Sequence, residues 1–157
     1  MTNPLFSLGG SLFLNRPAAN RTLAQLADTL ERDGLAITDR FTNAGDHAAN
    51  RRLLSHIIGI ERWGQRRLEV ALGEPLLLDE YDSYRPPQDT EWQPLLAEWR
   101  ATRNATLALI PQLETNADSA LRIPHNDFGP LTVGGWLHYL YLHAHFEARK
   151  TKKGAAN

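Results

Sequence analysis

The sequence predicts an all-α fold, a four-helix bundle with a long crossover connection. Four segments repeat their apolar residues with the helical period of about 3.6, and none of the chain between them alternates convincingly as a strand would. Linkers rich in glycine and proline separate the four segments. One connection, from about Gly73 to Gln88, is longer than an ordinary bundle loop, which favours a topology that is not simply up-and-down.

The first two helices are expected over about residues 20–41 and 46–72. Each has apolar residues spaced for one buried face: Leu23, Leu26, Leu30 and Ile37 in the first, and Leu53, Ile57, Ile60 and Gly64 in the second. Asp46 stands just before the second periodic segment. Its side chain can accept hydrogen bonds from the free N–H groups of a first helical turn, so it is the expected N-cap.

The third and fourth helices also have recognisable ends. The third is expected to begin near Thr90 and Gln93, which have the spacing of a capping box, and to end at Pro111. The fourth is expected to run from Thr132, whose hydroxyl suits an N-cap, to about Lys150.

The length of 157 residues fits one domain over 1–157, with a core at about residues 20–150, a short N-terminal arm and a frayed C-terminal tail. With 17 Lys+Arg against 18 Asp+Glu, the net charge of -1 gives no general attraction to nucleic acid or anionic membranes. No apolar run approaches the roughly 18 residues that span a bilayer. The N-terminus also lacks the basic start of a signal peptide. We therefore expect a cytoplasmic protein with no nucleic-acid or membrane partner.

Cysteine is absent from the chain. The protein can therefore form no disulfide, no thiolate metal site and no cysteine nucleophile. Any metal ion must be held by nitrogen and oxygen ligands, and any thiol chemistry must use a thiol from outside.

His143 and Glu147 form the most informative pair of the last predicted helix. Because they are four residues apart, their side chains differ by only about 40° in direction around a helix, so both can close on one metal ion. The apolar stripe of this helix lies within about 60° of His143 and contains Trp136, Tyr139, Leu140 and Phe146. The opposite, polar side carries His138, His145 and Arg149. Since polar groups buried without partners are costly, a metal ion would supply the partner that the pair needs.

His56, on the second helix, is the best candidate for a third ligand. It lies at the edge of the buried stripe, about 40–60° from Leu53 and Ile60. His47 projects to the far side, which suits a surface or capping residue. Glu61 lies off the stripe, where a surface ion pair is expected.

These residues also have ordinary structural interpretations. An inward His56 is more often a hydrogen-bonded core histidine, and His143 with Glu147 has the spacing of a common helix-surface pair. His125 lies in a linker rich in turn formers, where it is structural, solvent-exposed or at the mouth of a pocket. The long connection carries a cluster that could cover a cavity: Tyr81, Asp82 and Tyr84.

Two patterns carry a resemblance to a known family. The first is His-Ile-x-x-Ile-Glu-Arg-Trp over residues 56–63, and the second is Gly-Pro-Leu-Thr-x-Gly-x-Trp-Leu-x-Tyr-Leu-x-x-His over residues 129–143. In their order and separation they resemble the DinB-like (YfiT-like) superfamily of four-helix bundles, many of them candidate metalloenzymes. Neither pattern is specific alone, but together they predict this fold over about residues 21–150.

The resemblance also implies a metal site. In that superfamily a divalent metal ion is usually held by one histidine of the second helix and by a His-x-x-x-His pair on the last. By position, these ligands correspond to His56, His143 and Glu147, with glutamate where a histidine is usual. Glutamate in place of this histidine gives either a two-histidine, one-carboxylate site or a site that has lost its metal. The former suits zinc or nickel, with manganese or iron as alternatives.

Two classes of function follow from the resemblance. The first is a metal-dependent enzyme that transfers a low-molecular-weight thiol or hydrolyses a small substrate. No residue of the sequence identifies itself as a general base, so the catalytic residues stay unassigned. The second is a non-catalytic bundle, with or without metal, that acts as a stress-related scaffold. Either would be a homodimer by analogy with the superfamily.

Overall fold

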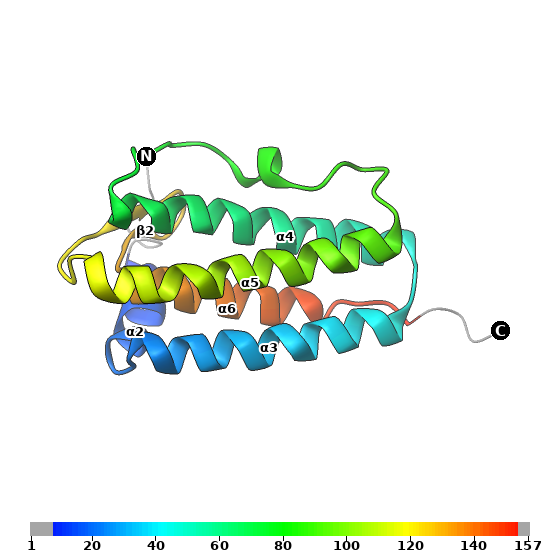
Figure 1. Ribbon diagram of the computed structural model, residues 1–157, viewed down its shortest axis with the longest axis horizontal. Coiled ribbons are helices and arrows are strands. Elements are labelled where there is room, and N and C mark those ends of the chain that lie inside the picture. The colour runs from blue at the N-terminus through cyan, green and yellow to red at the C-terminus, as the bar shows by residue number, and fades with distance from the viewer. Residues whose placement is uncertain (1–7, 154–157) are drawn as a thin grey trace.

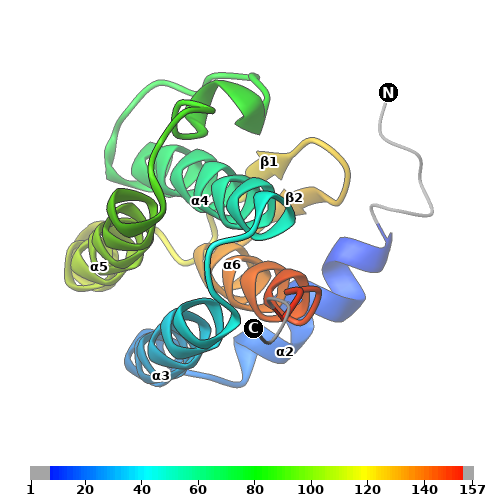
Figure 2. The same cartoon turned by 90° about the vertical axis from the view of Figure 1, so that its right-hand side faces the viewer.

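The computed structural model describes residues 8–153, and its four long helices confirm the all-α bundle (Figure 1). They are α3 (Leu23–Ala44), α4 (Ala48–Leu68), α5 (Trp92–Asn116) and α6 (Val133–Ala148). Helices α3 and α4 each pack against both α5 and α6 (Figure 2). The last turn of the second predicted helix is a 3-10 helix, η2 (Glu69–Leu72).

The connection between α4 and α5 is the predicted long crossover. It runs back along α4 before α5 begins, so α4 and α5 point in the same direction (Figure 1). Within it, the 3-10 helix η3 (Tyr81–Tyr84) packs on α4. Their close approach depends on Gly59 of α4, where an added Cβ would lie 2.5 Å from Cγ of Arg85. A larger residue at position 59 would push the crossover away from α4.

The predicted cap of α6 is confirmed, and that of α4 is wrong. The hydroxyl of Thr132 accepts from the backbone N–H of Gly135 at 2.8 Å. At α4 the N-cap is His47, whose Nδ1 accepts a hydrogen bond from the first turn. The Asp46 carboxylate instead binds the guanidinium of Arg51, with both N–O distances at 2.6 Å.

Helix α5 begins at Trp92, near the predicted start, but its predicted capping box and its predicted end at Pro111 are wrong. The hydroxyl of Thr90 donates to the carbonyl of Pro87 rather than accepting from a helical N–H group, so Thr90 and Gln93 form no capping box. The helix also continues past Pro111. Proline removes one backbone donor there, but Leu113 is buried in the core and holds the final turn in place.

A short antiparallel hairpin, which the sequence did not predict, joins α5 to α6. Strand β1 (Ile123–His125) pairs with β2 (Gly129–Leu131), and Ile123 lies opposite Leu131. Both of these side chains are buried in the core. Each strand has 3 residues, which is too few for an alternation of period two to stand out from a turn-rich linker.

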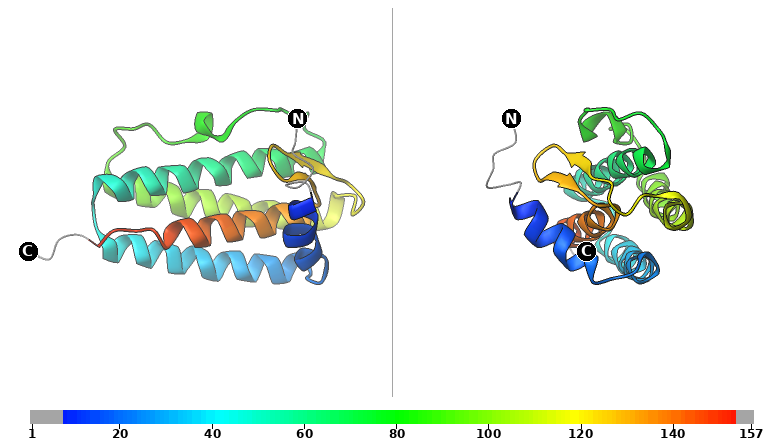
Figure 3. Two further views of the ribbon diagram at one scale, coloured as in Figure 1. Left: turned by 180° about the vertical axis from the view of Figure 1, so that it is seen from behind. Right: turned by 90° about the vertical axis from the view of Figure 1, so that its left-hand side faces the viewer.

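The described part of the predicted N-terminal arm is helical. A π-helical turn, η1 (Ser11–Asn15), and α2 (Arg16–Ala19) lie beside α6 and the hairpin (Figure 3). Asn15 fixes them there, since its Nδ2 donates to the carbonyl of Pro130 at 3.2 Å and its Oδ1 accepts from the N–H of Thr132 at 2.9 Å. The arm before residue 8 and the predicted frayed tail after residue 153 lie outside the described residues.

Helix α6 is strongly apolar, and one of its residues departs from the prediction. Trp136, Tyr139 and Leu140 are buried as expected, but Phe146 is 53% exposed. Phe146 lies at the margin of the predicted stripe, which the neighbouring helices do not cover. Between residues 8 and 153, no helix is long and apolar enough to cross a lipid bilayer.

The expectation of a surface ion pair at Glu61 is wrong, because Glu61 is 1% exposed and pairs with Arg103 of α5, which is 3% exposed. Arg103 Nε donates to one carboxylate oxygen at 2.7 Å, and Nη2 donates to the other at 2.9 Å. The hydroxyl of Thr106 donates to Oε1, and Arg103 Nη1 donates to the Leu30 carbonyl of α3. The apolar stripe of α4 marks only one of its buried sides, and α5 covers the side that carries Glu61.

We expect Glu61→Gln to lower the free energy of unfolding by about 3 kcal/mol, because it leaves the buried Arg103 guanidinium with only a more distant counter-charge, Asp33 Oδ2 at 4.0 Å. The matched control is Glu98→Gln, which breaks an ion pair between the same two helices. In that pair Arg62 Nη2 lies 2.8 Å from Glu98 Oε2, and the side chains are 32% and 33% exposed. An exposed pair contributes about 0–1 kcal/mol. Denaturant unfolding measures both losses, and similar values for the two variants would contradict the prediction.

Candidate metal centre

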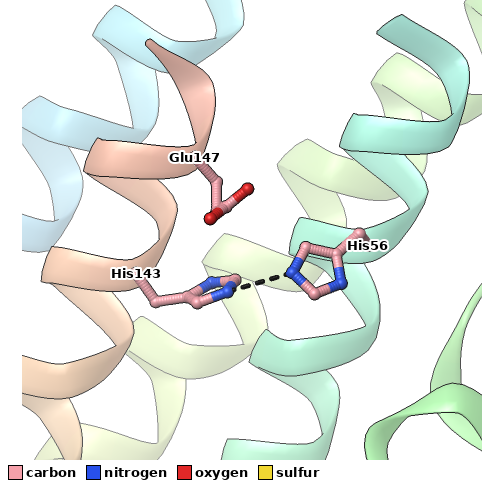
Figure 4. Close-up of side chains that lie close together, drawn as sticks. All are labelled: His56, His143 and Glu147. Atoms are coloured by element: carbon pink, nitrogen blue, oxygen red, sulfur yellow. Dashed lines mark hydrogen bonds between the residues drawn. The ribbon is translucent and has the colours of Figure 1, made fainter. Parts of the chain in front are cut away.

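Two neighbouring helices bring the predicted ligands together. His56 lies near the middle of α4, and His143 and Glu147 lie one turn apart near the end of α6. The three side chains are partly buried and point toward one another (Figure 4). We call them the His-His-Glu cluster. That the cluster binds a metal ion stays a prediction at this point.

The donor atoms of the cluster are close enough to share one ion. Nε2 of His56 lies 3.1 Å from Nε2 of His143. One potential ligand atom from each of the three residues lies within 4.8 Å of the others. Metal–nitrogen bonds of about 2.0–2.1 Å at a tetrahedral angle would separate two nitrogens by roughly 3.3 Å. The residues therefore fit a metal ion with little movement, and the group could hold one.

The three side chains are also in the protonation states that metal ligands need. Burial lowers the pKa of His56, and burial followed by the charge of His56 lowers the pKa of His143 to about 4. Partial burial alone would raise the pKa of Glu147, but the hydrogen bond and charge of Lys150 outweigh it and hold that pKa below its usual value. Near neutral pH the cluster offers two neutral imidazoles and a carboxylate, which are the forms that bind metal.

Aromatic rings hold the two imidazoles in place. Tyr81 of η3 packs edge-on against His56, with ring centroids 5.1 Å apart. The ring centroid of Tyr139, on the preceding turn of α6, lies 5.9 Å from that of His143. Metal-bound histidines usually donate their second ring N–H to a carboxylate, a carbonyl or water. Among residues 8–153 the buried Nδ1 of His143 has no such partner, so packing orients this ring.

Two other histidines lie where the sequence predicted. His145 points away from the cluster toward α3, where its Nδ1 lies 2.8 Å from Oδ1 of Asp33. His47 caps α4, as described above. Neither belongs to the candidate site.

His125, whose role the sequence left open, is 3% exposed and lies close to the cluster. Its Nδ1 accepts from the backbone N–H groups of Asp127 at 3.1 Å and Phe128 at 3.3 Å. Its ring stacks on Trp136, with centroids 5.0 Å apart, and meets Tyr139 edge-on at 4.6 Å. Tyr139 therefore separates His125 from His143.

Comparison with known proteins adds an independent observation. A family model described as the DinB superfamily matches residues 18–146. The matched region contains His56 and His143, and Glu147 lies one residue beyond it. Searches of curated proteins and of solved structures gave no match.

We expect His125 to make the protein less stable in acid. Burial, followed by the nearby charge of Arg67, lowers the pKa of His125 from 6.5 to about 3. Between these values the unfolded chain binds a proton that the folded chain does not. The free energy of unfolding therefore falls as the pH falls through this window, by up to about 1.4 kcal/mol per pH unit. His125→Asn keeps an acceptor near the position of Nδ1 but removes the titrating ring, so its stability should fall less steeply with acid.

Chemical unfolding between about pH 6.5 and pH 4, with a chelator present, measures this slope. His47→Asn is the matched control, because His47 also accepts from a backbone N–H through Nδ1 but is exposed. If His125→Asn keeps the wild-type slope, a buried neutral His125 is not a cause of the acid sensitivity.

Proposed function

The chain belongs to the DinB superfamily, and we propose that it is a divalent-metal-dependent enzyme in which His56, His143 and Glu147 hold the ion. The substrate in this proposal is a small molecule. Transfer of a low-molecular-weight thiol is the first candidate reaction, and hydrolysis of a small substrate is the second. Because the chain has no cysteine, the thiol must come from outside.

The observation that carries the proposal is the 3.1 Å approach of the two Nε2 atoms. If both imidazoles are neutral and no ion is bound, one Nε2 must carry the proton and donate it to the other. An ion between them would use the lone pairs of both nitrogens, with the ring protons on Nδ1. The Glu147 carboxylate, within 4.8 Å of both rings, would supply the third ligand.

The ligand set narrows the identity of the ion. Two histidines and one carboxylate suit zinc or nickel, which we propose first, and also manganese or ferrous iron. An ion held by these three ligands would keep a coordination position open, where it would lower the pKa of a bound water or thiol and polarise a substrate.

The chain's own residues prepare the site in this proposal. Burial keeps the two imidazoles neutral. Nζ of Lys150, 2.6 Å from Oε1 of Glu147, keeps the carboxylate ionised and restricts its rotation. Tyr81 and Tyr139 pack against the imidazoles and limit their movement.

The same contacts favour one alternative, a metal-free or non-catalytic scaffold. Glu147 already has Lys150 as a partner, and the imidazoles can hydrogen-bond one another. The atoms of the cluster that face one another can thus be satisfied by the protein alone. A homodimer is part of both proposals, and light scattering after size-exclusion chromatography tests it.

We expect the purified protein to bind close to one metal ion per chain after exposure to equal zinc and nickel. His56→Ala and Glu147→Ala should each weaken binding by more than about 100-fold. Removing a direct ligand should cost more than the 10–100-fold typical of its outer partners. Elemental analysis and a zinc titration measure these values. Saturating zinc should also raise the melting temperature of the wild type, because a ligand at 100 times its Kd stabilises the folded state by about 2.7 kcal/mol.

Two further variants serve as controls. His47→Ala removes an exposed histidine and should leave metal binding unchanged. Glu147→His restores the histidine usual in the superfamily and should retain the metal that Glu147→Ala loses. A wild type that takes up no metal would overturn the proposal.

A separate comparison distinguishes enzyme from scaffold. Without metal, we expect Glu147→Ala to cost less than about 1 kcal/mol, since Lys150 is largely exposed, at 64%, and such ion pairs contribute little. If Glu147→Ala abolishes turnover in a thiol-substrate screen and leaves the apo stability unchanged, the scaffold alternative fails. If the wild type loads metal but shows no turnover that depends on Glu147, the catalytic part of the proposal fails.

A further inference from the structure

A cleft of about 750 Å³ lies between α4 and the crossover. One wall is the first half of α4, and the opposite wall is the returning end of the crossover, from Asp82 to Thr90, with Leu95 of α5 at its base. Three arginines line it, Arg51, Arg52 and Arg85, and we call it the arginine cleft.

The arginine cleft contains one guanidinium group that no carboxylate of the described residues neutralises. Arg51 pairs with Asp46 at 2.6 Å and Glu91 at 3.5 Å. Arg85 lies 3.5 Å from Asp82, so the unpaired positive charge in the lining is that of Arg52. Ala48, in the first turn of α4, also lines the cleft. The positive end of that helix dipole adds to the field of the arginines. An anion is therefore the ligand that the cleft attracts.

Two of the arginines are held in place by the protein. Arg85 Nε donates to the hydroxyl of Ser55 at 3.2 Å, and its Nη2 donates to the carbonyl of Arg52 at 3.2 Å. Arg51 is fixed by Asp46 at the edge of the cleft. Guanidinium groups held in this way lose little freedom when they bind a ligand.

The side chain of Arg52 is different. It is exposed, and within the described part of the chain its guanidinium makes no hydrogen bond or ion pair with the protein. Arg52 precedes His56 by four residues on α4, so the two side chains lie one turn apart on the same face, about 5–6 Å between Cβ atoms. Arg52 thus lines the cleft one helical turn from His56.

The crossover also contacts both the His-His-Glu cluster and the arginine cleft. Tyr81 packs against the His56 ring, and Asp82, the next residue, lines the arginine cleft. A molecule in the cleft would therefore lie beside the cluster rather than on a separate face. The cleft has the volume of a small-molecule site, typically about 300–1,000 Å³.

We propose that the arginine cleft binds the carboxylate or phosphate group of the small-molecule substrate, with Arg52 closing on it. Arginine recognises both groups through paired N–H···O hydrogen bonds. The inference deepens the proposed function and rests on it for the reacting end of the substrate. Anion binding itself requires no metal ion.

Inorganic phosphate is the probe for this proposal. Metal-free protein is titrated with phosphate at low ionic strength, by calorimetry and by following the arginine Nε–H resonances. We expect saturable binding to one site, with the Arg52 resonance among those that shift. Arg52→Gln should weaken binding by about tenfold or more, and Arg52→Lys, which keeps the charge, by less.

Arg40→Gln is the matched control, since Arg40 is an exposed arginine on α3 and outside the cleft. It should bind phosphate as the wild type does. Equal losses in Arg52→Gln and Arg40→Gln, or no saturable binding by the wild type, would overturn the anion site.

The proposed function is tested separately. Arg52→Gln should keep its metal, and His56→Ala should lose metal but still bind phosphate. If metal binds and phosphate does not, only the anion site is wrong. If phosphate binds and metal does not, the anion site stands but the metal enzyme does not.

Discussion

The buried ion pair between Glu61 and Arg103 fixes the position of α4 along the bundle. A slide of one turn, about 5.4 Å, would leave the charge of Glu61 buried and unpaired, which costs several kcal/mol. Arg103 also donates to the Leu30 carbonyl of α3, so the pair holds three helices in register. His56 lies little more than one turn before Glu61 on the same helix. The level at which His56 meets α6, and hence its approach to His143, follows from this register.

The crossover packs on the outer side of α4 and places side chains beside His56, as α6 does on the inner side. Gly59 lets it lie close to the helix, and that closeness places Tyr81 on the His56 ring and Arg85 against Ser55. A connection that only joined the ends of two helices could be shorter. The additional length of the crossover forms one wall of the arginine cleft, beside the candidate metal centre.

The long helices and the His-His-Glu cluster could be predicted because they depend on a local rule, the direction in which side chains leave a helix. His143 and Glu147 share one helix, and His56 lies at the edge of a clear apolar stripe. The burial of Glu61 could not be predicted in this way, since it depends on which second helix covers α4. Pro111 predicted a helix end because proline disfavours a helix interior, but the packing of Leu113 in the core outweighs that local preference. The hairpin and the buried His125 depend on contacts of a turn with α4 and α6, which no short window of sequence contains.

The order in which the helices pack has a consequence for synthesis on the ribosome. Helices α3 and α4 emerge first but hardly touch one another, and each buries its apolar face against α5 and α6. The first half of the chain therefore has no core of its own. Helix α6 ends 80 residues after α4, which at 5–20 residues per second is a delay of roughly 4–16 s. During that interval the apolar faces of the nascent chain are open to chaperones and to other chains, and the fold closes only after α6 has emerged.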